Sequence, residues 1–229
     1  MKVLFVGPSL PGAHRIVAND IEIRPPACQG DIMRAVADGA SRIGLIDGQF
    51  NYAAPVWHKE ILFALSRDIT VLGAASMGAL RACECAAFGM VGVGAIFEDY
   101  MSGRRDDDSD VALLYGPEKL GYPHLTIPLV NLDATLSTIS AKQMLDAKIC
   151  QRIHDAARRI FFKQRSWKCV LTEAGLDYEE VKPVIDQCWT DQKKIDSLQL
   201  LNEFNGPAAA PQPKEWQFNA TPMFRKLYM

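Results

Sequence analysis

Short apolar runs alternate with helix-like segments through the first hundred residues, and this alternation restricts the fold more than any other feature. Four runs, at residues 3–6, 21–23, 43–46 and 69–72, have the length and composition of buried strands. The spacing of apolar residues between them predicts helices over about 30–38, 55–65 and 77–88. Strands separated by helices of this length form mostly parallel sheets. We therefore expect an α/β fold.

The pattern changes after Gly103. A charged loop over residues 104–110 precedes 111–115, which we interpret as one more strand. From about 130 to 204 the chain is helix-like, with turn signals at 175–177 and at Pro183. We expect an α/β core over 1–128, a mainly helical region over 129–204, and a linker with an aromatic tail over 205–229.

The charge balance argues against whole classes of partner. Twenty-five Lys and Arg residues stand against 27 Asp and Glu, a net charge of −2, whereas proteins held to nucleic acid by phosphate contacts carry a basic surplus. No apolar run approaches the roughly 18 residues of a membrane span. The N-terminal apolar run is broken by Gly7-Pro8, too early for a signal peptide. We expect a cytoplasmic protein with no nucleic-acid or membrane partner.

Neither a metal nor a nucleotide cofactor is indicated. The six cysteines contain no C-x-x-C pair, and the acidic run 106–110 lacks the ordered spacing of a cation loop. Residues 73–78 have the glycine spacing of a phosphate loop, but Ala79 and Leu80 stand where Lys and Ser/Thr are needed. We expect buried thiols and no cofactor.

The segment from Val71 to Arg81 carries the strongest chemical signal. A buried strand ends, small residues follow, Ser76 stands at the turn and a helix begins, as in a nucleophile elbow. The backbone N–H groups of Met77 and Gly78 would then stabilise an oxyanion. The competing interpretation is that Ser76 only caps the helix, as serines often do.

A serine nucleophile needs a base, and two adjacent residues compete for that role. His58 and Lys59 both lie on the helix before the Ser76 strand, and a lysine qualifies only if its pKa is lowered towards neutrality. Neighbouring helix residues point about 100° apart, so at most one faces Ser76. Asp47 ends a buried strand at the edge where α/β proteins bind ligands, which makes it a candidate substrate-binding residue.

Taken together and in order, several motifs resemble the TfuA-like family over roughly the first 130 residues. They are Gly7-Pro8-Ser9-Leu10, Pro25-Pro26-Ala27, Gly30-Asp31-Ile32, Ile43-Gly44-Leu45-Ile46-Asp47-Gly48-x-Phe50, Val56-x-His58-Lys59-Glu60-Ile61-Leu62, Gly73-Ala74-Ala75-Ser76-Met77-Gly78-Ala79-Leu80-Arg81 and Phe88-Gly89-Met90-x-Gly92-x-Gly94.

The resemblance implies a role beside a YcaO-type enzyme in peptide backbone thioamidation. It implies that the protein hydrolyses the thiocarboxylate of a ThiS-type sulfur carrier, releases sulfide and promotes engagement of the peptide by the YcaO enzyme. The family's Ser–Lys pair falls on Ser76 and Lys59, and Arg81 becomes a candidate for binding the anionic thiocarboxylate. The chain departs from the family pattern at Cys83-Glu84-Cys85 and at Leu132-Asp133, where an arginine is expected.

Two other functions fit the sequence. In the first, the protein is a non-catalytic adaptor that binds the YcaO enzyme and the peptide, and Ser76 is structural. In the second, Cys83 or Cys85 carries sulfur as a persulfide. An adaptor tolerates loss of Ser76 or Lys59, and a persulfide carrier tolerates both losses but fails when the cysteine is replaced.

Overall fold

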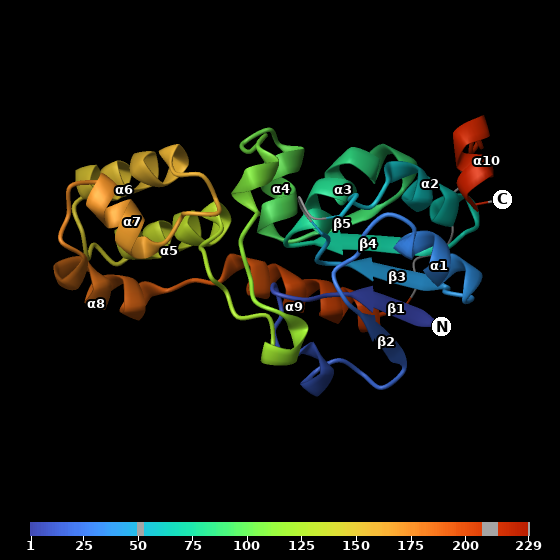
Figure 1. Cartoon of the computed structure of the whole chain (residues 1–229), viewed down its shortest axis with the longest axis horizontal. Coiled ribbons are helices and arrows are strands. Elements are labelled where there is room, and N and C mark those ends of the chain that lie inside the picture. The colour runs from blue at the N-terminus through green and yellow to red at the C-terminus, as the bar shows by residue number, and fades with distance from the viewer. Residues whose placement is uncertain (50–52, 208–214, 229) are drawn as a thin grey trace.

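A parallel five-stranded sheet forms the centre of the protein in the computed structural model, which describes residues 1–49, 53–207 and 215–228 (Figure 1). Phe50 and most of the expected linker lie outside these ranges. The strands are β1 (Lys2–Phe5), β2 (Ile21–Arg24), β3 (Arg42–Leu45), β4 (Thr70–Ala74) and β5 (Val91–Val93), in the order β2-β1-β3-β4-β5. Every neighbouring pair is parallel, which confirms the expected α/β class.

The fifth strand is not the one that the sequence predicts. Residues 111–115 join no strand, and Tyr115 forms only an isolated bridge with His124. The edge strand is β5 instead, whose central residue is Gly92. A Cβ atom there would lie 2.1 Å from the Phe97 ring, so the strand must carry a glycine that weakens its sequence signal.

Helices α1 (Asp31–Ala37), α2 (His58–Ser66) and α3 (Met77–Cys85) cover one face of the sheet (Figure 1). Alternate strand residues point to opposite faces. Val3 and Phe5 of β1 accordingly join the core beneath these helices, whereas Leu4 joins the core of the other face. The inner strands β1, β3 and β4 are thus buried on both sides, which explains their apolar sequences, whereas the edge strands β2 and β5 are partly exposed.

The other face is covered by α9 (Gln192–Asn205), which comes from the region expected to be helical. Its apolar residues Leu200, Leu201 and Phe204 share a core with β1 and β4. Gly44 of β3 leaves room for this contact, because a Cβ atom there would lie 2.6 Å from Leu4 and 3.3 Å from Phe204. Helix α4 (Ala95–Met101) is joined to α9 by the Asp196 carboxylate, which accepts from the Ile96 N–H at 2.8 Å.

Four helices form a separate bundle with its own core beside the carboxyl ends of the strands (Figure 1). They are α5 (Leu129–Ala141), α6 (Ala147–Arg159), α7 (Trp167–Glu173) and α8 (Tyr178–Cys188). The predicted turn at 175–177 is confirmed, with Gly175 at φ 67° and Asp177 capping α8. Pro183 marks no turn. It lies inside α8, where the buried residues Val181 and Ile185 pack the helix on the bundle core.

Single 3-10 turns are η1 (Ala13–Arg15), η2 (Ala86–Phe88), η3 (Asp108–Asp110) and η4 (Glu118–Leu120).

The aromatic tail folds back on the body of the protein. Its helix α10 (Pro222–Tyr228) places Phe224, which is 0% exposed, against the ring of Phe63 on α2 at a centroid distance of 5.6 Å. Phe218 packs against Phe63 at 5.5 Å, and the Tyr228 hydroxyl donates to the buried Glu60 carboxylate at 3.2 Å. The tail therefore completes the outer surface of α2.

Replacing Phe224 by Ala removes a fully buried ring from this cluster and should lower the free energy of unfolding by about 3–5 kcal/mol. Met223, on the same helix, is 64% exposed, and its replacement by Ala should change stability by no more than about 0.5 kcal/mol. Chemical denaturation of the two variants checks the difference. Equal effects would mean that the tail does not pack on α2 in solution.

Candidate functional site

Residues that follow three of the strands line a cavity of about 420 Å³ at the carboxyl end of the sheet. Pro8 follows β1, Asp47 and Gly48 follow β3, and Ser76 follows β4. The opposite wall is the segment 111–117, with Leu125 and Phe162. The cavity thus lies where open α/β sheets place their ligands.

The turn that carries Ser76 is sharp, and its small residues are required by contact. Ala75 has φ 65°, and the N–H of Ser76 donates across it to the Ala74 carbonyl at 2.7 Å. A Cβ atom on Gly73 would lie 2.1 Å from the Gly78 carbonyl oxygen, and one on Gly78 would lie 1.8 Å from that of Leu45. The left-handed residue is Ala75, while Ser76 itself has φ −124°. The sequence identifies the turn but not which residue carries its strain.

The Ser76 side chain does not serve as a helix cap. Ser76 is the N-cap residue of α3 and is 3% exposed, yet its hydroxyl makes no capping hydrogen bond. Within the ranges that the structure describes, no other protein group bonds to this hydroxyl. Capping therefore does not explain why a serine stands at this position in the cavity wall.

The two backbone donors that the sequence suggests differ in availability. The N–H of Gly78 donates to the Ile46 carbonyl at 3.1 Å and is not free to bind an oxyanion. The N–H groups of Met77 and of the cavity residue Gly48 find no acceptor among the described residues. Of the two predicted donors, only the N–H of Met77 is available to bind an oxyanion.

Asp47 lies in the cavity wall with its oxygens already occupied. It is buried and accepts from the N–H of Gly7 at 2.8 Å, the N–H of Ser9 at 2.9 Å and the Ser9 hydroxyl at 2.6 Å. These bonds hold the turn after β1, which brings Pro8 to the cavity. Asp47 thus shapes the site and adds negative charge to it.

The structure does not bring Lys59 or His58 to Ser76. The Lys59 ammonium donates to the Asn219 carbonyl at 2.6 Å, three residues before α10. Helix α10 lies on the side of the amino ends of the strands (Figure 1). His58 pairs with Glu84 at 2.7 Å. Glu84 lies eight residues beyond Ser76, which is about 12 Å along α3 at 1.5 Å per residue. His58 therefore contacts the far end of α3, and Lys59 contacts the tail.

Arg81 also points away from the cavity. Its guanidinium donates to the Val56 carbonyl at 2.9 Å and to Glu84 at 2.6 Å, and its side chain is buried. It links α3 to the start of α2 rather than standing at the cavity entrance.

Sequence reasoning missed Lys193 of α9. This residue is 0% exposed, and its ammonium donates to the carbonyl of Val111, a cavity-lining residue, at 2.8 Å. Burial lowers the Lys193 pKa to about 8, although the charges of Asp47 and Asp191 oppose the shift. A signal was present, since Lys193 shares the helical face of Ser197, Leu200 and Phe204, all buried.

The cysteines are poor candidates for sulfur chemistry. Burial, with a smaller effect of Glu84, raises the Cys85 pKa to about 12 and also raises that of Cys83. Both are therefore thiols near neutral pH, while the thiolate is the reactive form. Across residues 1–49, 53–207 and 215–228 there is no cluster of three metal-ligating side chains and no helix long and apolar enough to cross a bilayer.

Comparison with known proteins identifies the family. A scan against protein-family models matches residues 47–166, just over half of the chain, to the family described as TfuA-like protein. The match covers β4, α3 and the cavity wall 111–117. No curated protein matches the chain. The chain belongs to the TfuA-like family, and this membership supports a role as partner of a YcaO-type enzyme in peptide thioamidation.

Proposed function

We propose that the protein is a hydrolase that uses Ser76 to cleave the thiocarboxylate of a ThiS-type sulfur carrier and releases sulfide for a YcaO-type enzyme. The observation that carries the proposal is a serine hydroxyl at a strained strand–helix turn, with no capping partner, in the wall of a cavity. The cavity lies at the carboxyl end of the sheet, where α/β proteins bind ligands, and in this proposal it receives the C-terminal tail of a carrier protein. Promotion of YcaO–peptide engagement belongs to the same proposal.

We propose Lys193 as the base, in place of Lys59. A catalytic lysine must be neutral, and burial makes Lys193 far easier to deprotonate than an exposed lysine. Its bond to the Val111 carbonyl puts the amine behind the cavity wall, and in this proposal it acts on Ser76 through one water. Lys59 is held instead by the tail.

The proposed reaction has two steps. Neutral Lys193 takes the proton of Ser76 Oγ, which attacks the thiocarboxyl carbon, and the Met77 N–H stabilises the oxyanion. The C–S bond breaks, and the sulfur leaves as hydrosulfide, HS⁻, with the proton from Lys193; the proton released in the hydrolysis step converts it to hydrogen sulfide. Water then hydrolyses the acyl-serine ester with Lys193 again as base. One thiocarboxylate and one water give one carboxylate and one hydrogen sulfide.

Replacement of Ser76 by Ala should abolish sulfide release from a thiocarboxylated carrier and leave the melting temperature unchanged, because the lost hydroxyl bonds to no described group. Ser140, exposed on α5, provides the matched control, and Ser140→Ala should retain full activity. Sulfide release by a well-folded Ser76→Ala variant would remove Ser76 from the mechanism and favour the adaptor.

Replacement of each lysine by methionine distinguishes Lys193 from Lys59 as the base. Lys193→Met should lower the rate of sulfide release by about 10²-fold or more, since a general base contributes 10²–10⁴-fold. The variant should fold, because an apolar side chain of similar length removes a buried charge. Lys59→Met should leave the rate within about twofold of wild type. A large loss of rate with Lys59→Met but not with Lys193→Met would assign the base to Lys59, as the sequence predicts.

The pH dependence provides a further check. Only neutral Lys193 accepts a proton, and its pKa is about 8. The rate should therefore fall about tenfold per pH unit below that value and level off above it. The rate of sulfide release, measured from pH 6 to 10 with the carrier in excess, tests this pH profile. A rate that does not change between pH 6 and 8 would contradict a lysine base.

A further inference from the structure

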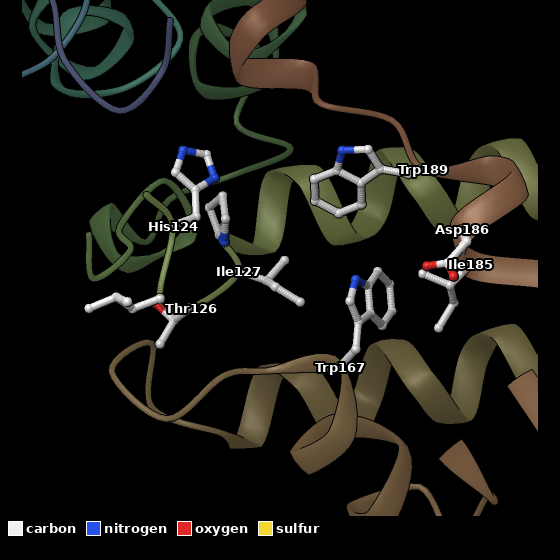
Figure 2. Close-up of a pocket in the computed structure, with 9 residues that line it drawn as sticks. His124, Thr126, Ile127, Trp167, Ile185, Asp186 and Trp189 are labelled. Carbon is white, nitrogen blue, oxygen red and sulfur yellow. The ribbon is translucent and has the colours of Figure 1, made fainter. Parts of the chain in front are cut away.

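A second cavity lies where the helical bundle meets the loop after the Ser76 cavity wall (Figure 2). Trp167 at the start of α7, together with Ile185 and Asp186 at the end of α8, forms one side with Trp189. Residues 124–128 form the other side. The volume is about 270 Å³, below the usual range of about 300–1,000 Å³ for small-molecule sites. A space of this size suits one amino-acid side chain better than a cofactor.

Two indole rings meet at a right angle in this cavity. The rings of Trp167 and Trp189 are 6.5 Å apart at their centroids with an interplanar angle of 81°. Figure 2 shows both side chains directed to a common space, with Ile127 opposite them and Asp186 at one end. Tryptophan faces attract cations more strongly than those of the other aromatic residues. We call the space between the two indole rings the corner. Trp189 is 43% exposed, so the corner is accessible from solvent.

The charges around the corner favour a cation. Helix α8 carries the carboxylates of Glu179, Glu180 and Asp186 against the single amine of Lys182, which pairs with Asp186. No lysine or arginine is among the described residues that line the cavity. The His124 Nε2 donates to the Pro8 carbonyl at 2.7 Å, so its proton on that nitrogen is already used.

We propose that this corner is a binding site for the cationic side chain of an arginine or lysine in a partner polypeptide. The indole faces of Trp167 and Trp189 contact the cation, and Asp186 accepts from it through Oδ1, because Lys182 bonds to Oδ2. Ile127 and Ile185 contact the aliphatic part of the side chain.

The position of the corner also suggests which polypeptide supplies the cation. Leu125 lines both this cavity and the Ser76 cavity, so the two are neighbours along one surface. A polypeptide whose end reaches Ser76 would pass Leu125 and present a nearby side chain to the tryptophans. This extension rests on the proposed function, whereas the cation site itself does not.

The test is a titration of the full chain with N-acetyl-arginine amide and with its neutral isostere N-acetyl-citrulline amide, observed by the four indole N–H signals in a ¹⁵N NMR spectrum. Arginine should shift the signals of Trp167 and Trp189, and citrulline should not. Trp57, which packs against Phe224, and Trp216, which packs against Phe88, serve as internal controls.

Asp186→Asn should weaken arginine binding about fivefold, and Trp189→Ala should remove the shift of the Trp167 signal. Equal shifts with citrulline, or none with either compound, would overturn the cation site. The titration works equally on the Ser76→Ala variant, so a failure of the proposed hydrolysis does not affect it. Conversely, an active hydrolase without arginine-specific shifts would reject the cation site alone.

Discussion

The contact between the first turn of α3 and the end of β3 determines the geometry of the site. The Gly78 N–H bonds to Ile46, and a side chain at position 78 would overlap the Leu45 carbonyl. Helix and strand therefore touch backbone to backbone, and the chain between β4 and α3 must turn within two residues. Ala75 takes the left-handed conformation that this turn needs. Ser76 is fixed at the carboxyl edge of the sheet as a consequence, and Asp47 and Pro8 are held beside it by strands of the same sheet.

Burial of the Lys193 ammonium group costs electrostatic free energy. An ammonium group loses most of its hydration free energy when it leaves water, and one carbonyl bond with two distant carboxylates compensates only in part. A leucine would fill the same position on α9 at lower cost. The lysine thus stands out as a residue that packing alone does not explain, and it lies behind the wall of the cavity that contains Ser76. Proteins place such perturbed groups at functional sites more often than elsewhere.

Local patterns predicted the sheet better than the site. The strands β1 to β4 are apolar runs ended by turn residues, so their positions follow from sequence alone, and the same holds for the small residues around Ser76. Strand β5 was missed because Gly92 is required by Phe97 and weakens the pattern. The separation of Lys59 from Ser76 depends on how α2 lies on the sheet and on the tail that holds Lys59, and neither has a local signal. The helical spacing of Lys193 with Leu200 and Phe204 indicates burial, but only the tertiary structure shows that α9 brings it behind the Ser76 cavity.

The position of α9 also affects how the chain reaches its native state. Leu4 of β1 shares a core with Leu200 and Phe204, which lie about 200 residues further along the chain. One apolar face of the sheet therefore remains exposed until the ribosome has made α9. Contacts between such distant segments slow folding, and exposed apolar strands are prone to aggregate. Chains that stop before α9 should consequently depend on chaperones to stay in solution, even though they contain every strand of the sheet.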